Sequence, residues 1–211
     1  MAHNLASLLR LMLVTDDALV GERDVVALAQ AAVRGGVTAV QLRLKRASPR
    51  ELCEIARVLG GAVGVPVLVN DRVDVALAAG AAGVHLGPDD LPVALARRIA
   101  PAGFIVGASV GNADEAASAG GADYWGVGPW RATGTKADAG EPLGPEGLRR
   151  IVALAAAIPC VAIGGVRPDD VGVVRAAGAV GVAVVSGILG AVDVEGAARR
   201  YGKAVNGTGK R

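Results

Sequence analysis

Short apolar runs alternate with longer segments of helical periodicity along almost the whole chain. The apolar runs lie at residues 11–14, 39–42, 67–70, 83–86, 105–109, 124–127, 160–163 and 181–186. Between them, apolar residues recur at helical spacing, for example over residues 25–33, 52–59, 73–79 and 91–99. Runs this short are typical of strands buried on both faces, and the intervening segments are typical of amphipathic helices. The pattern therefore predicts eight strand-plus-helix units of roughly 26 residues each.

Local signals at the ends of the helical segments support this division. Four residues near the starts of predicted helices have side chains that suit N-caps, namely Ser48, Asp71, Asn112 and Asp169. Eight parallel strands close into a barrel, whereas doubly wound sheets usually have fewer strands. We therefore predict an α/β fold, a single (β/α)8 TIM barrel whose eight parallel strands are ringed by helices. It spans residues 1–211 as one domain, with 1–10 as a lead-in and 203–211 as a frayed tail.

Composition agrees with such a barrel and excludes several classes of protein. Apolar residues make up 52% of the chain and aromatic residues 2%, so Ala, Val, Leu and Ile must build the core. The formal net charge of +2 does not call for nucleic acid or an anionic membrane as a partner. No apolar run reaches the roughly 18 residues that a membrane span needs. Arg10 interrupts the apolar stretch near the N-terminus, which argues against a signal peptide.

The two cysteines indicate a reducing compartment. Cys53 and Cys160 lie far apart in the sequence, each among apolar residues. This context favours structural burial over a disulfide or a nucleophilic role. We therefore expect a cytoplasmic protein.

In a barrel of this kind, chemistry collects where the strands end and the following loops begin. The second predicted strand ends in Gln41, Arg43 and Lys45, which alternate with leucines and therefore share one face. An amide, a guanidinium and an ammonium group facing the barrel mouth are costly to bury unless an anion meets them. The alternative is a surface strand end with solvated charges.

Carboxylates follow the third and fourth strands. Asp71 comes after Asn70, and Asp90 comes after the fourth strand, so the two carboxylates belong to neighbouring strands. Mg²⁺ typically takes one or two carboxylates together with substrate phosphates, so this pair suits one Mg²⁺ ion. The alternative is that both residues cap helices. His85, inside the fourth strand, favours a core or barrel-lining role over that of a ligand or general base.

The longest break in the pattern follows the sixth strand. Residues 124–136 pass from an apolar run through two glycines to Thr133, Thr135 and Lys136. Hydroxyl groups, backbone amides and an ammonium group suit a multiply charged anion such as a phosphate. Long loops inside compact domains are usually functional or disordered, so a surface loop with a solvated lysine is the alternative.

Three further strand ends carry small or polar residues. Ser109 ends the fifth strand at the rim, Gly164 and Gly165 follow the seventh, and Ser186 ends the eighth. The loops after strands seven and eight of such barrels frequently bind a phosphate through backbone amides. The sequence shows no nucleophile with a partnered base and no lone lysine placed for a Schiff base. A diphosphate ester activated by Mg²⁺, with a second phosphorylated substrate nearby, fits these residues better than aldol chemistry.

Seven of these segments, in order and spacing, resemble the thiamine phosphate synthase family. They are QLRLK, VNDR, GVHLGPDD, GASV, GPWRATGTK, AIGGV and VVSGI, and the resemblance runs from about residue 15 to residue 188. Enzymes of that family join 4-amino-5-hydroxymethyl-2-methylpyrimidine diphosphate to 4-methyl-5-hydroxyethylthiazole phosphate, giving thiamine phosphate and diphosphate. The resemblance implies a transferase of thiamine biosynthesis that acts on small molecules and uses Mg²⁺.

The resemblance also implies roles for individual residues. The pyrimidine diphosphate would contact Gln41, Arg43, Lys45, Asn70, Ser109 and Lys136, of which Arg43, Lys45, Ser109 and Lys136 would take part in catalysis. Mg²⁺ would bind Asp71 and Asp90. The thiazole phosphate would contact Thr133, Thr135, Gly165, Val185 and Ser186. Diphosphate would leave first, and the thiazole nitrogen would capture the remaining pyrimidinylmethyl cation.

Two positions depart from the family pattern. Pro88 stands where the family usually has glutamine, and Arg131-Ala132 replaces an aromatic residue followed by proline. Pro88 removes a side-chain hydrogen-bonding group and an N–H beside the metal site, and Arg131 adds a charge to a mobile loop. Two other functions stay open: a thiazole tautomerase of the same fold, and a non-catalytic barrel that binds thiazole or thiamine phosphate. The sequence also leaves open a homodimer, the use of Mn²⁺ and a carboxylated thiazole substrate.

Overall fold

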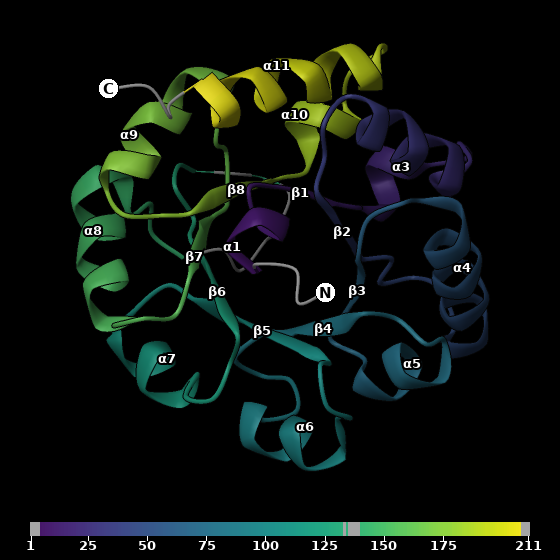
Figure 1. Ribbon diagram of the computed structural model, residues 1–211, viewed down its shortest axis with the longest axis horizontal. Coiled ribbons are helices and arrows are strands. Elements are labelled where there is room, and N and C mark those ends of the chain that lie inside the picture. The colour runs from purple at the N-terminus through teal and green to yellow at the C-terminus, as the bar shows by residue number, and fades with distance from the viewer. Residues whose placement is uncertain (1–4, 133, 135–139, 208–211) are drawn as a thin grey trace.

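Eight parallel strands form a closed barrel in the computed structural model, which describes residues 5–132, 134 and 140–207. Each strand pairs with its neighbours in chain order, and the first strand also pairs with the last, as Figure 1 shows. The strands are β1 (Leu11–Val14), β2 (Ala39–Leu42), β3 (Val67–Asn70), β4 (Gly83–Leu86), β5 (Ile105–Val110), β6 (Tyr124–Val127), β7 (Cys160–Ala162) and β8 (Gly181–Val184). This topology confirms the predicted fold class.

Helices ring the outside of the barrel, except α1, which lies over one of its ends (Figure 1). They are α1 (Leu5–Leu8), α2 (Asp17–Val20), α3 (Val25–Arg34), α4 (Pro49–Ala62), α5 (Val73–Ala78), α6 (Val93–Ile99), α7 (Ala113–Ser118), α8 (Gly144–Leu154), η1 (Pro168–Asp170), α9 (Val171–Ala176), α10 (Ser186–Leu189) and α11 (Val194–Gly207). In the part of the chain that the structure describes, no helix is both long and apolar enough to cross a membrane.

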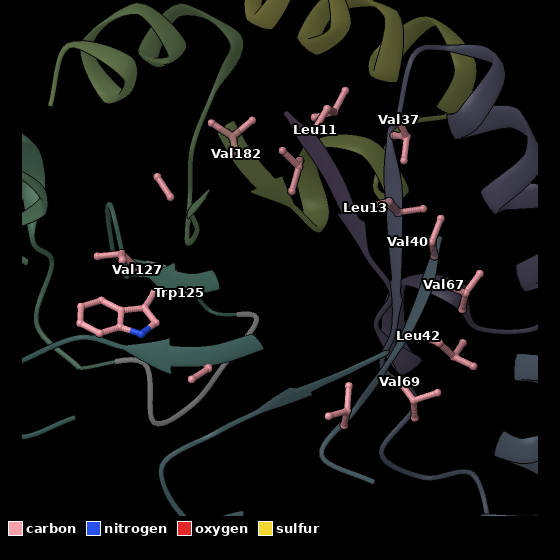
Figure 2. Close-up of a cluster of buried hydrophobic side chains, with 14 of the residues drawn as sticks. Leu11, Leu13, Val37, Val40, Leu42, Val67, Val69, Trp125, Val127 and Val182 are labelled. Atoms are coloured by element: carbon pink, nitrogen blue, oxygen red, sulfur yellow. The ribbon is translucent and has the colours of Figure 1, made fainter. Parts of the chain in front are cut away.

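The strands are largely apolar because both of their faces are buried. Side chains alternate between the two faces, so Leu11 and Leu13 point towards the helices while Met12 points into the barrel. The layer between strands and helices is the larger one, and Figure 2 shows part of it around Leu13 and Trp125. Aliphatic residues dominate both layers, as the composition predicts.

The barrel interior is closed at the end where the strands begin. Helix α1 lies over this end in Figure 1, and Leu5 and Leu9 pack against the interior residues. The interior cluster comprises Leu9, Met12, Val14, Ala39, Leu68, Tyr124, Val161 and Ala183. The described part of the predicted lead-in, residues 5–10, therefore forms the floor of the barrel, and the opposite end is the one left for polar residues.

The predicted helix caps are confirmed in two cases and wrong in two. Ser48 forms a capping box with Glu51, and Asn112 caps α7 by accepting from the backbone N–H of Glu115. Asp71 caps nothing, because α5 begins after Arg72 without a side-chain cap. Asp169 lies inside η1 instead of preceding a helix.

The frayed tail predicted from residue 203 is wrong for residues 203–207. These residues form the last turn of α11, whose length extends to Gly207. Val205 is buried with an exposed fraction of 5%, because α11 packs against α3 across the point where the barrel closes. Cys160 is buried and Cys53 half-buried, and both are free thiols.

Gly83 should tolerate no side chain, because a β-carbon there would collide with the backbone carbonyl of Ile105 on the neighbouring strand. We expect Gly83→Ala to lower the free energy of unfolding by about 1–3 kcal/mol, as overpacking in a rigid core does. Urea unfolding followed by circular dichroism measures this change.

Gly61→Ala is the matched control for this prediction. Gly61 lies in α4 with no atom within 4 Å of the added β-carbon. Alanine is the better helix former, so this variant should gain about 0.5–1 kcal/mol. A Gly83→Ala protein as stable as wild type would show that β4 and β5 can separate at little cost.

Candidate active site

Polar residues at the carboxyl ends of β2 and β3 meet at the open end of the barrel. Gln41, with an exposed fraction of 4%, donates from Nε2 to Oδ1 of Asn70 over 2.8 Å. This bond fixes both amides and leaves Oε1 of Gln41 and Nδ2 of Asn70 for other partners. Two neighbouring strands thus present one acceptor and one donor at the base of the mouth.

Arg43 and Lys45 follow β2 and lie progressively further from the interior. The half-buried guanidinium of Arg43 is 3.1 Å from Oδ2 of Asp16, and Lys45 Nζ is 3.6 Å from Oδ2 of Asp71. The backbone N–H of Arg43 donates to Oγ1 of Thr15, which holds the chain here as it leaves the strand. Both cations after β2 therefore have acidic neighbours, Arg43 on the side of β1 and Lys45 on the side of β3. The shared face expected for Gln41, Arg43 and Lys45 stays a prediction.

Asp71 and Asp90 lie side by side and neither caps a helix. Burial raises the pKa of Asp71 to about 6, and the carboxyl group of Asp90 adds to the shift through a hydrogen bond and its charge, while Lys45 opposes it. Asp71 has a φ of 65°, and its backbone N–H donates to the carbonyl of His85 on β4. The carboxyl group of Asp71 interacts with Asp90 in the loop after β4, and α5 has no side-chain cap.

The loop after β4 fixes the second carboxylate. Oδ2 of Asp90 accepts from the backbone N–H of Gly87 over 2.6 Å, which closes the loop around Pro88. Helix α6 begins after Pro92 without a side-chain cap, so the interpretation of Asp90 as a helix cap is wrong. Pro88 is exposed and has no backbone N–H. The bond that closes the loop is unaffected, because its donor is the N–H of Gly87.

Two adjacent carboxylates of this kind repel each other once both are ionised, and a divalent cation would offset that repulsion. Among the described residues no group of three or more His, Cys, Asp and Glu side chains gathers to hold a metal ion. A pair of carboxylates is nevertheless the set that Mg²⁺ takes when substrate phosphates complete its coordination. Burial is the main cause of the raised pKa of Asp71, and the neighbouring carboxyl group of Asp90 adds to it.

A chain of hydrogen bonds crosses the barrel interior beside these residues. His85 is buried on β4, with Nδ1 2.9 Å from the hydroxyl of Tyr124 and Nε2 3.0 Å from Oγ of Ser109. The prediction that His85 lines the barrel is confirmed. The role of Tyr124 was missed, because the sequence shows only an aromatic residue at the start of an apolar run.

A cavity of about 720 Å³ opens at the mouth between the ends of β1, β6, β7 and β8. Its lining residues include Asp16, Leu19, Arg131, Gly134, Gly165, Arg167 and Ser186. Gly164 and Gly165 have φ values of 90° and 71°, which favour glycine, and Gly165 brings bare backbone to the surface of the cavity. Val185 is half-buried beside the interior cluster, directly before Ser186. Thr133, Thr135 and Lys136 lie outside the described residues.

Arg131 is tied to the neighbouring loop, which corrects the interpretation that it adds a loose charge. Its two terminal nitrogens are each 2.5 Å from a carboxylate oxygen of Asp170, and Asp170 is buried with an exposed fraction of 8%. The same carboxylate accepts from the backbone N–H of Arg167. The loop after β6 is therefore joined to the loop after β7 at one wall of the cavity.

Removal of this pair should weaken the wall. We expect Arg131→Ala to lower the free energy of unfolding by about 1–2 kcal/mol, because Asp170 keeps its burial and loses its charged partner. In an Asp170→Asn background the same substitution should cost much less, since the two residues act as a unit. Thermal unfolding of the two single variants and the double variant measures this coupling, and purely additive effects would contradict it.

Comparison with known proteins places the chain in a family. The family model described as "Thiamine monophosphate synthase" matches residues 11–188. The thiamine-phosphate synthase of Moorella thermoacetica is 49% identical over 190 residues, covering 88% of this chain and 90% of that protein. That of Chloroflexus aurantiacus is 50% identical over 204 residues, covering 94% of each. The solved thiamine phosphate pyrophosphorylase from Pyrococcus furiosus superposes with a TM-score of 0.87 at 41% identity, covering 98% of this chain and all of that one. The chain therefore belongs to the thiamine monophosphate synthase family.

Proposed function

We propose that the protein condenses 4-amino-5-hydroxymethyl-2-methylpyrimidine diphosphate with 4-methyl-5-hydroxyethylthiazole phosphate, yielding thiamine phosphate and diphosphate. Family membership supports the reaction, and one observation in this chain supports it most strongly. The carboxylate pair of Asp71 and Asp90 and the ammonium group of Lys45 stand at the mouth that also holds the Gln41–Asn70 pair. That combination suits a metal-bound diphosphate attached to a small polar ring.

The pyrimidine diphosphate would occupy the side of the mouth formed by β2 to β5. Oε1 of Gln41 would accept from the amino group of the pyrimidine, and Nδ2 of Asn70 would donate to the diphosphate. Mg²⁺ would bind Asp71 and Asp90 and offset the negative charge that builds up on the leaving diphosphate. Arg43, Lys45, Ser109 and Lys136 would add positive charge and a hydroxyl donor around the same group.

The thiazole phosphate would occupy the cavity between the ends of β6, β7, β8 and β1. Backbone N–H groups near Gly165 and Ser186 would bind the phosphate, with Thr133 and Thr135 on the opposite loop and Val185 against the ring. The lining of this cavity by exposed glycine backbone supports the assignment, because a β-carbon would hold a phosphate away from the amides.

The reaction needs no covalent intermediate with the protein. The bond between the pyrimidine methylene carbon and the diphosphate oxygen breaks, and its electron pair leaves with the diphosphate. The ring nitrogen of the thiazole then donates its lone pair to the methylene carbon. The protein's part is to place the two substrates in line and to stabilise the charge of the leaving group.

Thiamine phosphate formation from the two substrates tests this function. Product should form with Mg²⁺ and disappear with excess chelator, and a parallel reaction with Mn²⁺ tests metal choice. Product that survives chelation would overturn the metal assignment alone. Binding of thiazole phosphate without product would overturn the synthase and indicate a tautomerase or a binding protein. The homodimer and the cytoplasmic location stay predictions, for which light scattering and cell fractionation are the measurements.

A further inference from the structure

Three polar side chains form a continuous hydrogen-bond chain from the barrel centre to its mouth. Tyr124 on β6 contacts Nδ1 of His85 on β4, and Nε2 of His85 contacts Oγ of Ser109 on β5, at 2.9 and 3.0 Å. Two glycines make the room for it. A β-carbon at Gly107 would collide with the Tyr124 ring, and one at Gly126 would lie 3.0 Å from Cε1 of His85. The surrounding strands are therefore built around this chain.

The direction of donation along these hydrogen bonds is set at their buried end, at Tyr124. Tyr124 has an exposed fraction of 1%, and burial raises the pKa of its phenol far above the usual range, so the hydroxyl keeps its proton. Among the described residues, Nδ1 of His85 is the one hydrogen-bond partner of this hydroxyl. A buried O–H without an acceptor is unfavourable, so Tyr124 must donate to Nδ1.

This donation fixes the other two members in turn. Nδ1 of His85 accepts, so the neutral imidazole carries its proton on Nε2. Nε2–H then donates to Oγ of Ser109, which is left with its own hydrogen to donate elsewhere. In the other neutral tautomer, with the proton on Nδ1, the Tyr124 hydroxyl would be buried without an acceptor. Ser109 would then donate its hydroxyl hydrogen to Nε2 of His85 and could not donate it to a ligand.

We propose that Tyr124 and His85 are positioning residues that hold the hydroxyl of Ser109 as a donor to the departing diphosphate. The same tautomer prevents His85 from acting as a base on Ser109, because Nε2 is already protonated. The inference rests on the proposed function, since it assigns the ligand of the Ser109 hydroxyl. Only Ser109 would touch the substrate, and the other two act through it.

The tautomer of His85 can be observed directly in the wild-type protein. The chain has two histidines, His3 and His85, so ¹⁵N-histidine labelling gives two imidazole spin systems, and His3→Gln assigns them. We expect His85 to be neutral near pH 7.5, with the proton on Nε2 and an accepting Nδ1. A proton on Nδ1, or on both nitrogens, would overturn the proposal. This measurement needs no turnover and no substitution of Tyr124, His85 or Ser109.

Kinetics test whether the chain acts through Ser109. Ser109→Ala should lower kcat about 10- to 100-fold, as loss of a donor to a charged group does. Tyr124→Phe should lower kcat about 5- to 10-fold while KM changes less than about 2-fold, because the substrate contacts remain. In the Ser109→Ala background the Tyr124→Phe effect should shrink to less than about 2-fold. An undiminished effect in that background would overturn positioning through Ser109.

Two controls complete the experiment. Ser118→Ala removes a hydroxyl on α7 that bonds only to the Asp114 carbonyl among the described residues, and its kcat should match wild type. Circular dichroism of Tyr124→Phe shows whether the barrel is intact; the NMR result stands if that variant does not fold. Absence of thiamine phosphate from the wild-type reaction would overturn the proposed function, whereas the tautomer reports on the hydrogen-bond chain alone.

Discussion

Replacement of Asp71 by asparagine is expected to remove most of the turnover and the Mg²⁺-induced stabilisation while leaving the barrel folded. Asparagine tolerates the φ of 65° at this position, whereas alanine would add backbone strain to the loss of the ligand. Loss of one of two carboxylate ligands should lower Mg²⁺ affinity by about 10- to 100-fold or more. Isothermal titration with Mg²⁺ and diphosphate, together with the steady-state assay, measures both effects.

The metal-free Asp71→Asn protein should also be as stable as wild type, or more so. Because the pKa of Asp71 is raised to about 6 in the folded protein, the ionised carboxyl group costs stability at neutral pH. That cost is full above pH 6 and is relieved as the pH falls below the folded pKa towards the unfolded value. The difference in Tm between variant and wild type should therefore be largest near pH 7.5 and shrink towards pH 4.

Asp89→Asn is the matched control for Asp71→Asn. Asp89 is an exposed carboxylate in the same loop as Asp90, and the proposal gives it no role. Its substitution should leave Mg²⁺ binding and turnover within about 2-fold of wild type, since an isolated surface charge contributes little. If Mg²⁺ affinity and turnover fell equally in both variants, the general negative charge around the site would be the cause. That result would contradict the assignment of Asp71 as a ligand.

Lys45→Met is expected to lower kcat by about 10²- to 10³-fold, the range for removal of a group that stabilises charge in the transition state. Methionine retains most of the aliphatic stem, so the loss should come from the ammonium group. Lys45 Nζ is 3.6 Å from Oδ2 of Asp71 and lowers the pKa of that carboxyl group, so Mg²⁺ affinity must be measured beside kcat. Assays at saturating Mg²⁺ separate the loss of charge from the loss of metal.

Arg46→Met controls for the removal of a cation from the same loop. The Arg46 side chain is exposed, and its backbone N–H, which bonds to Asp17, is untouched by the substitution. This variant should keep kcat within about 2-fold of wild type. An unchanged kcat of Lys45→Met at saturating Mg²⁺ would show that Lys45 does not stabilise the leaving diphosphate.

The strands and the half of the mouth formed by β2 to β4 were predictable because they follow from parallel pairing. Apolar runs fix the strand positions, and the carboxyl ends of neighbouring parallel strands must meet. Asn70 and Asp71 therefore come close to Gln41 and Asp90 in any barrel with this strand order. The last turn of α11 was wrongly predicted as a frayed tail because its composition is polar. Its packing against α3, which buries Val205, is visible only in the structure.

The Tyr124–His85–Ser109 chain and the Arg131–Asp170 pair were not predictable from sequence pattern. The hydrogen-bond chain depends on the stagger of the strands, which places Tyr124 level with Gly107. Stagger is a property of barrel closure and leaves no local periodicity. The direction of a long side chain such as Arg131 likewise depends on which carboxylate the next loop offers.

Closure of the barrel through the pairing of Leu11 with Val182 has a consequence for synthesis of the protein. During synthesis β1 is made before β2 to β7 and its second partner, β8, after them, so one edge of β1 stays unpaired until all of these strands have emerged from the ribosome. Contacts this distant in sequence slow folding, and an unpaired strand edge can pair with another chain in the meantime. Chaperones that shield nascent strands should therefore matter more for the yield of this barrel than for its stability once made.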